Sequence, residues 1–325
     1  MGHIIIIGSG QIGSRHLQSL AKIDRETMVS VFDPSINSLN LARERYNEMP
    51  HNNLVKSVLY SQNLDDLRND VDVAVVATNA DVRLRVLEKL LSRVGVRYLI
   101  LEKVVFQSVD DFKDVLDLLK KNKTKAWINF SRRMMPFYKG IKNSIDSNEK
   151  VYIHLEEGDL GLIQSSIHFL DLLLFFTKEK QLFLDGSGID GHVQKSKREG
   201  HVELTGLLRG KTEKCSEITV IDYPGSNASD VIHVFGKNIR FMFSETLSKA
   251  YIAKANNSWE WEEESFSVSY QSDLTHQAIE QALDTGKCEL PSLEDSFLLH
   301  EAFLNMINDH LERITGKRHT KCPIT

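Results

Sequence analysis

The segment from Gly161 to Phe176, GLIQSSIHFLDLLLFF, contains residues suited to acid–base chemistry. Read with helical spacing, Gln164, His168 and Asp171 fall on one stripe, and apolar residues lie beside them. An imidazole changes charge near neutral pH, so it can give or take a proton. The stripe is either a set of buried polar side chains that bond one another or a catalytic face turned into a cleft.

A second group suited to chemistry, Glu102 and Lys103, ends the apolar run LILEK. The carboxyl end of a strand in an open parallel sheet is where ligands bind. A lysine at that place can hold a hydroxyl or carbonyl oxygen and help to move its proton. The alternative is a solvated pair of opposite charges at the end of a strand.

The glycines of IIIIGSGQIG follow an apolar run directly and have the spacing G-x-G-x-x-G. Gly8 permits a tight turn, Gly10 lets a pyrophosphate approach the backbone, and Gly13 lets a helix pack on the strand. Asp33 ends the next apolar run, where its carboxylate would bind a ribose 2′-hydroxyl and repel a 2′-phosphate. The segment DPSINS offers no arginine beside it. The pattern predicts NAD(H) as the cofactor, in preference to NADP(H).

The elements that position these residues alternate between strand and helix over the first 130 residues. Strands are expected at 3–8, 28–33, 54–60, 71–78, 97–103 and 125–130. Helices are expected at 11–23, 35–46, 81–94 and 108–122. Such alternation predicts an α/β fold with a Rossmann-type, doubly wound parallel sheet.

The pattern changes after about residue 130. Helices are expected at 134–147, 161–176, 273–286 and 292–316, with β segments at 150–158, 201–210, 215–223, 231–236, 238–244 and 265–270. Runs of strands predict a C-terminal α+β domain with a large, mostly antiparallel open sheet. We expect a dinucleotide-binding domain over 1–128 and a substrate-binding and oligomerisation domain over 129–325. The final helix, at about 293–315, is a candidate to pack back on the first domain.

The composition is that of a globular protein with a sizeable core, since 41% of the 325 residues are hydrophobic and 26% are charged. A net charge of −5 gives no reason to expect nucleic acid or a membrane as partner. The three cysteines are far apart and predict reduced thiols. No histidine or cysteine spacing predicts a metal site, and no apolar run is long enough to cross a bilayer. We therefore expect a cytoplasmic protein.

The order of several motifs resembles the glucose–fructose oxidoreductase / inositol dehydrogenase (Gfo/Idh/MocA) family over nearly the whole chain. They are GSGQIG, VDVAVVATNADVRLRVLEKLL, VRYLILEK, NFSRRMMPFY and HFLDLL. The resemblance implies hydride transfer between NAD(H) and a hydroxyl or ketone carbon of a sugar, cyclitol or sugar-nucleotide. Family habit suggests a role in surface glycan biosynthesis, and a homodimer or homotetramer built on the second sheet.

The resemblance also implies roles for particular residues. Lys103 matches the lysine of the family's Glu-Lys-Pro motif, and His168 matches the histidine that acts as acid and base on the reacting hydroxyl. Gln164 stands where the family has an aspartate, Val104 stands in place of its proline, and Arg83 lies near a common histidine and receives no role. The implied cofactor-binding residues are Gly8, Ser9, Gly10, Gln11, Ile12, Gly13, Asp33, Thr78, Asn79, Glu102 and Lys103.

Two questions stay open at the level of sequence. Arg132, Arg133 and Tyr138 are candidates for substrate contact, but ordinary surface or interdomain salt bridging is the preferred interpretation. A catalytically silent NAD(H)-binding regulatory protein on the same fold is the alternative to an enzyme. Gln164 and Val104 keep that alternative open, because a glutamine cannot stabilise an imidazolium as a carboxylate does.

Overall fold

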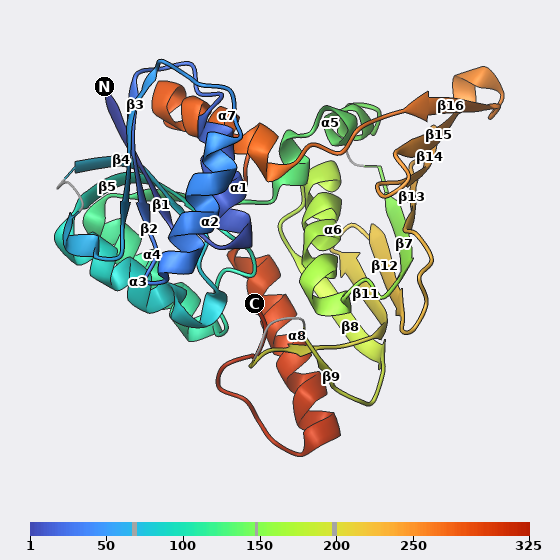
Figure 1. Ribbon diagram of the computed structural model, residues 1–325. Coiled ribbons are helices and arrows are strands. Elements are labelled where there is room, and N and C mark those ends of the chain that lie inside the picture. The colour runs from blue at the N-terminus through green and yellow to red at the C-terminus, as the bar shows by residue number, and fades with distance from the viewer. Residues whose placement is uncertain (67–69, 147–148, 197–199) are drawn as a thin grey trace. The chain divides into compact units, whose positions relative to one another are not determined.

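The computed structural model describes residues 1–66, 70–146, 149–196 and 200–325. The chain divides into two compact units (Figure 1). The first unit consists of Met1–Phe106, Asp110–Ser131 and Ser269–Asp295. The second consists of Gln107–Val109, Arg132–Val268 and Ser296–Thr325. Residues 269–295 therefore belong to the first unit although they lie near the end of the chain.

The first unit contains a six-stranded sheet in the order β3-β2-β1-β4-β5-β6, and every neighbouring pair is parallel. Its strands are β1 (Gly2–Ile7), β2 (Thr27–Phe32), β3 (Val55–Ser61), β4 (Asp70–Val76), β5 (Gly95–Leu101) and β6 (Lys125–Ile128). Residues 4–7 of β1 are fully buried, as expected of a strand covered on both faces. The predicted Rossmann-type parallel sheet is confirmed.

Helices accompany this sheet, and all but the last of them connect its strands. They are α1 (Gln11–Leu20), α2 (Ile36–Asn47), the 3-10 turn η1 (Leu64–Asp66), α3 (Ala80–Arg93), α4 (Val109–Asn122) and α7 (Gln271–Thr285). Ser35 caps α2, because its side chain accepts a hydrogen bond from the backbone N–H of Ser38. Helix α7 packs on α1, although the two are far apart in sequence (Figure 1).

The direction of winding reverses between β1 and β4, since β2 and β3 lie on one side of β1 and β4 to β6 on the other. In open sheets of this kind the crevice beyond the carboxyl ends of the strands at the reversal point binds ligands. The turn after β1 carries the spaced glycines, and the turn after β4 carries Thr78 and Asn79. The topology therefore brings two distant candidate segments to one edge of the sheet.

The second unit is built on an eight-stranded sheet in the order β16-β15-β14-β13-β7-β12-β11-β8. Only the β7–β12 pair is parallel, which confirms the predicted mostly antiparallel sheet. Its strands are β7 (Tyr152–Gly158), β8 (Leu182–Ile189), β11 (Gly206–Thr212), β12 (Glu217–Tyr223), β13 (Val231–Phe235), β14 (Ile239–Ser244), β15 (Lys249–Lys254) and β16 (Trp261–Ser265). A separate two-stranded ladder joins β9 (Gln194–Lys195) to β10 (Val202–Glu203).

Within the described residues, three helices pack in the second unit: α5 (Pro136–Asn143), α6 (Leu162–Thr177) and α8 (Phe297–Thr315). The 3-10 turns are η2 (Ser131–Met134) and η3 (Ala255–Asn257). Helix α6 lies on β11 and β12, and α8 lies along β8 (Figure 1). Among the described residues, no helix combines the length and apolarity needed to span a membrane.

Several sequence-based expectations for the second unit were wrong in detail. The segment 201–210 forms parts of two strands, β10 and β11, and β8 and β15 were not predicted. The helix expected at 134–147 is shorter, ending at Asn143, and residue 147 lies outside the described residues. The helix expected from 292 begins at Phe297.

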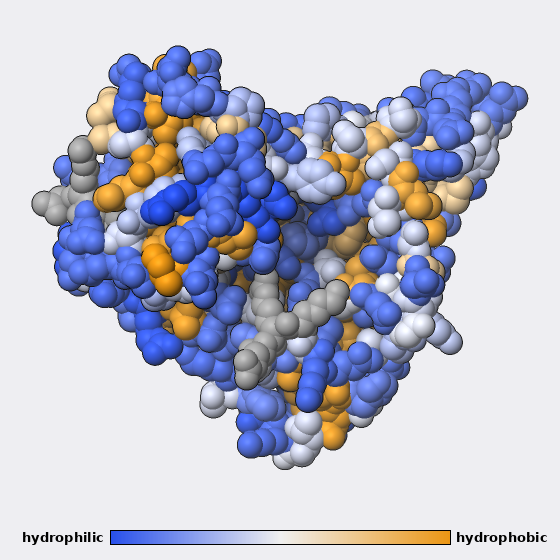
Figure 2. Space-filling view, viewed as in Figure 1, coloured by the Kyte–Doolittle hydropathy of each residue, from blue (hydrophilic) through white to orange (hydrophobic). Residues whose placement is uncertain are grey.

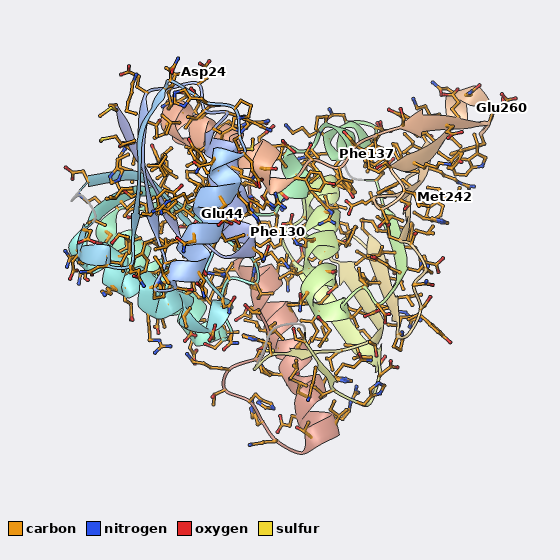
Figure 3. All side chains as sticks on the ribbon, viewed as in Figure 1. Asp24, Glu44, Phe130, Phe137, Met242 and Glu260 are labelled. Carbon is orange, nitrogen blue, oxygen red and sulfur yellow. The ribbon has the colours of Figure 1, made fainter. Side chains whose placement is uncertain are left out.

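The strand expected at 265–270 was also misplaced, because the sheet ends at Ser265. Phe266 instead stacks on Phe137, with ring centroids 4.0 Å apart and planes 14° from parallel. Phe137, labelled in Figure 3, also meets Phe243 edge-on at 4.9 Å. Ring contacts of this kind add to the stabilisation from buried area, and here such a contact takes the place of strand pairing. On the face shown in Figure 2, hydrophobic surface forms separate areas within a mostly hydrophilic surface.

Candidate active site

The turn after β1 has the geometry that its glycines allow. Gly8 has a φ of +84°, and a Cβ on it would lie 2.9 Å from the backbone nitrogen of Thr78. A Cβ on Gly13 would lie 1.8 Å from the carbonyl oxygen of Gly8, so only glycine lets α1 approach the turn so closely. Around Gly10 nothing lies within 4 Å of an added Cβ. The turn thus leaves open space in front of the N-terminus of α1.

Asp33 follows β2 and is buried beside this turn. Its Oδ2 accepts a hydrogen bond of 2.7 Å from the backbone N–H of Ser9, and its Oδ1 accepts one of 2.8 Å from Ser35. Each oxygen has a further lone pair, so the carboxylate can still accept a ligand hydroxyl. The contact with Ser9 fixes the carboxylate relative to the glycine turn.

A cavity of about 620 Å³ lies in the first unit at the reversal point of the sheet. A second cavity, of about 710 Å³, is lined by β8 and α8 in the second unit. The wall of the cavity in the first unit includes five of the predicted residues: Gly8, Gly10, Asp33, Thr78 and Asn79. Helix α3 contributes Val82 and Val86, and also the exposed cations Arg85 and Lys89. The segment beside Asp33 contains no arginine, but the fold brings two cations to the same cavity from elsewhere.

The residues at this cavity fit a dinucleotide. The hydroxyls of Ser9 and Thr78 are buried and have no hydrogen-bond partner within the described part of the chain. Buried polar atoms normally have partners, so two orphaned hydroxyls beside an open glycine turn are suited to a bound polar ligand. Of the other predicted residues, Gln11 is exposed and accepts a hydrogen bond from Arg45, and Ile12 is half-buried.

Glu102 and Lys103 follow β5, and the peptide bond between Lys103 and Val104 is cis. Oε1 of Glu102 lies 2.9 Å from Nε2 of His16 and 2.5 Å from Nδ2 of Asn129. Burial raises the pKa of Glu102, but the contacts with His16 and Asn129 and the charge of Lys103 outweigh burial, so that its pKa lies below the ordinary value. The Glu102 carboxylate is therefore held as an anion inside the first unit, next to a half-buried Lys103.

Helix α6 carries His168 and begins at two buried carboxylates. Asp222 accepts hydrogen bonds from the backbone N–H groups of residues 160–162, and Glu203 accepts one of 2.7 Å from Ile163. Anions are stabilised at a helix N-terminus, so these contacts fix the start of α6. Gln164 donates a hydrogen bond of 2.9 Å to the hydroxyl of Ser196. His168 is half-buried one turn further along.

Asp171, at the far end of the polar stripe of α6, pairs with a residue outside the stripe. Asp171 accepts two hydrogen bonds from Arg133, of 2.8 and 2.7 Å, and its side chain is almost fully buried. Arg132 makes a similar two-bond contact, of 2.8 and 2.5 Å, with Glu245, and the hydroxyl of Tyr138 donates to the same carboxylate. Both arginines are thus engaged in salt bridges within the second unit, the alternative that their sequence left open. Their contact with a substrate stays a prediction.

The sequence did not predict a special role for Glu157, a carboxylate on β7 of the second sheet beside Asp222. Burial raises the pKa of Glu157 to about 7, and the nearby charges of Asp230, Glu245 and Asp222 act in the same direction. Glu157 and Asp222 are register partners on β7 and β12. Such a group changes charge near neutral pH, which a carboxylate in water does not do.

Sequence reasoning also missed Arg83, which is 1% exposed, and the partners of His16. A signal for Arg83 existed, because it lies on the buried stripe of α3 that also contains Ala80, Leu87 and Leu90. A cation in an apolar stripe predicts an internal partner. Lys103 and His168 belong to different units, and their approach at one substrate stays a prediction.

Comparisons with known proteins agree with this architecture, an NAD(P)-binding Rossmann domain joined to a unit with a large open sheet. Residues 3–130 match the Gfo/Idh/MocA model, described as an oxidoreductase family with an NAD-binding Rossmann fold. Over these residues the chain is similar to the family that its motifs resembled. No curated protein sequence matches the chain significantly.

Solved structures share the fold over 94–98% of this chain at low sequence identity. A Gfo/Idh/MocA family oxidoreductase from Vibrio cholerae is 15% identical, with a TM-score of 0.69, over 98% of this chain and 100% of that one. UDP-N-acetylglucosamine 3-dehydrogenase from Acidithiobacillus ferrooxidans is 14% identical, with a TM-score of 0.71, over 94% and 96%. A super-repressor mutant of Gal80p from Saccharomyces cerevisiae is 13% identical, with a TM-score of 0.72, over 96% of each chain. The fold alone therefore does not separate an enzyme from a regulator.

Proposed function

We propose that this protein is an NAD(H)-dependent oxidoreductase that acts on a hydroxyl or ketone carbon of a sugar, cyclitol or sugar-nucleotide. The observation that carries the proposal is the cavity at the reversal point of the first sheet, whose wall includes the glycine turn, Asp33 and the orphaned hydroxyl of Thr78. Lys103 follows the neighbouring strand on the same edge of that sheet. A role in surface glycan biosynthesis and assembly as a homodimer or homotetramer belong to the same proposal.

In this proposal separate groups of residues bind the cofactor and act on the substrate. Ser9, Gly10 and the N-terminus of α1 hold the pyrophosphate, and Asp33 accepts from the adenosine ribose. The bound nicotinamide accepts or supplies the hydride. Lys103 holds the reacting oxygen, and His168 takes the hydroxyl proton during oxidation and returns it during reduction. Gln164, fixed by Ser196, orients polar groups near His168 but adds no charge to the site.

The test is a titration with NADH followed by a substrate panel monitored by nicotinamide absorbance. The panel contains polyols, free sugars and sugar-nucleotides, including UDP-N-acetylglucosamine because a similar structure acts on it. We expect turnover with at least one compound. Lys103→Met and His168→Ala should each lower kcat by about 100- to 10,000-fold while the Kd for NADH changes little. Turnover at the wild-type rate in both variants would refute these catalytic roles.

The second candidate function is a catalytically silent NAD(H)-binding regulator. It is favoured by Gln164, which replaces a carboxylate and is bonded to Ser196, and by the likeness to a repressor. Tight NADH binding with no turnover across the whole panel would support this candidate and refute the enzyme. A useful variant is Gln164→Asp, since a carboxylate in place of the amide would raise turnover if charge beside His168 limits the rate.

A further inference from the structure

Arg83 occupies an unusual place, in the first turn of α3 with its side chain buried. Its Nη1 lies 2.6 Å from the carbonyl oxygen of Glu102, 2.6 Å from that of Val104 and 2.7 Å from that of Val105. Its Nη2 donates to the carbonyl oxygen of Thr78. One guanidinium thus binds the backbone that follows two neighbouring strands, β4 and β5.

The helix itself gains nothing from a cation at this position. The N-terminus of a helix carries partial positive charge, so an arginine in the first turn is unfavourable for α3. Burial adds the cost of removing the charge from water. The hydrogen bonds to backbone carbonyls offset these costs, because charge-assisted hydrogen bonds are the strong ones. The physical reason for Arg83 therefore lies in the backbone that it binds.

The carbonyl groups that follow β5 need hydrogen-bond donors, because this segment has left the sheet but is still buried. Val104 and Val105 are fully buried, and a buried carbonyl without a partner is costly. The residue between two of the bound carbonyls is Lys103. On the other side, the carboxylate of Glu102 is held by His16 and Asn129. Lys103 is consequently flanked by two fixed residues, although its own side chain is half-buried and reachable.

We propose that Arg83 is a positioning residue that sets the direction of Lys103 and the distance between the β4 and β5 turns. The proposal rests on the function proposed above, because it concerns the lysine assigned to the reacting oxygen. Arginine suits this role because its planar fork offers donors in fixed directions to several carbonyls at once. A lysine at position 83 offers one ammonium group and cannot reproduce that geometry.

The test compares Arg83→Lys and Arg83→Gln with the control Arg93→Lys. Arg93 lies on the same helix and forms a partly exposed ion pair with Asp65. We expect both Arg83 variants to lose about 10- to 100-fold in kcat with less than about a threefold change in KM and in the Kd for NADH, since small misplacements of a reacting group cost that much. The control should match the wild type. Wild-type kcat in Arg83→Lys would overturn the proposal.

A second measurement does not depend on turnover. The rate of acylation of Lys103, followed by peptide mass spectrometry against pH, reports the environment of its amine. Hydrogen exchange of the amides of residues 102–106 reports the order of the turn. We expect the Arg83 variants to shift the pH profile of Lys103 and to speed exchange there, while a variant that is merely less stable leaves the midpoint of the profile unchanged. An unchanged profile and unchanged exchange would refute the positioning role.

These two measurements separate the proposal from the proposed function. If the wild type shows no turnover on the panel, the enzyme fails, and the labelling and exchange data still decide whether Arg83 positions Lys103. If the wild type turns over and the Arg83 variants do so equally well, the enzyme stands and the positioning role fails. Arg83→Lys is the milder change, so it provides folded protein for both measurements when Arg83→Gln does not.

Discussion

Nε2 of His16 lies 2.9 Å from Oε1 of Glu102, and both side chains are buried. The other ring nitrogen of His16 lies 2.7 Å from the hydroxyl of Thr275. His16 belongs to the helix that follows the glycine turn, Glu102 directly precedes Lys103, and Thr275 lies on α7. One imidazole therefore connects the cofactor-side helix, the strand end with the candidate lysine, and a helix from near the end of the chain.

We expect His16→Ala to destabilise the first unit by about 2–4 kcal/mol, because it leaves the Glu102 carboxylate with less compensation for its burial. The pKa of Glu102 should rise in this variant. In the wild type its folded pKa is lowered, so its contribution to stability is present above the ordinary value of 4.5 and is lost as pH falls through the folded value. Hydrogen exchange of β1 amides at pH 7 and at lower pH measures the stability of the variant relative to the wild type. A stability difference between His16→Ala and the wild type that stayed constant as pH falls would contradict the role given to the Glu102 carboxylate.

The salt bridge between Arg133 and Asp171 gives a second prediction. Asp171 is 1% exposed, and burial raises its pKa against the opposing effect of Arg133. Arg133→Ala should cost about 3–5 kcal/mol in unfolding free energy at pH 7, because it leaves a buried carboxylate unpaired. The deficit should shrink as pH falls, since Asp171 then becomes protonated. Urea unfolding of Arg133→Ala and of Arg133→Met with Asp171→Leu tests this, and the double change should cost less.

The same variants decide between the two interpretations of Arg133. If Arg133→Met with Asp171→Leu is stable but raises KM for the identified substrate by more than about tenfold, Arg133 also contacts the substrate. If KM is unchanged, the arginine serves packing alone.

Glu157 provides a prediction on pH. Its folded pKa of about 7 is raised, mainly by burial, above the ordinary value of 4.5. A carboxyl with a raised pKa binds its proton more tightly when folded, so its contribution favours the fold below pH 4.5 and is lost as pH rises through 7. Glu157→Gln should therefore be more stable than the wild type at pH 8, by about 1 kcal/mol after allowance for solvent screening, and equal to it near pH 4. Thermal unfolding against pH measures the difference, with the exposed neighbour Glu156→Gln as control.

The architecture of the first unit was predictable because its signals are local. A run such as IIIIG is a strand wherever it occurs, and the glycine spacing identifies the turn that follows. In the second unit, β8 reads LFLDGSGI, and its two glycines and its aspartate hide the strand pattern. The segment after Ser265 has the alternation of a strand, but it does not continue the sheet, and Phe266 stacks on Phe137. Tertiary packing decides such cases, and a single sequence does not show it.

The same distinction between local signals and tertiary packing applies to the candidate site. The candidate residues near the glycine turn were predictable because spacing within one segment places them. The partners were not, because the contact between His16 and Glu102 spans 86 residues and depends on the strand order. Arg133 was read from its sequence as either a substrate contact or a salt bridge, and only its bidentate contact with Asp171 shows the second. The type of a residue predicts which contacts its side chain can make, and the order of strands and helices determines which residue it contacts.

The cavity wall makes a final prediction, on cofactor preference. Asp33 is buried beside the turn, where its negative charge would repel a 2′-phosphate, so NADH should bind more tightly than NADPH to the wild type. Arg85 and Lys89 line the same cavity and supply positive charge to it. In Asp33→Ser we expect NADPH to gain at least about tenfold in affinity relative to NADH, because the repulsion is removed while the cations remain. Calorimetric titration of both cofactors measures the ratio.

The cations can be tested in the same background. Adding Arg85→Ala and Lys89→Ala to Asp33→Ser should abolish most of the gain for NADPH and leave NADH binding within about threefold, because NADH lacks the 2′-phosphate whose charge these cations would neutralise. The gain should also weaken with added salt. Lys120→Ala, on α4 and outside the cavity wall, is the matched control for loss of surface charge. A gain for NADPH that survives removal of both cations would mean that Asp33 alone sets the preference and that α3 takes no part in it.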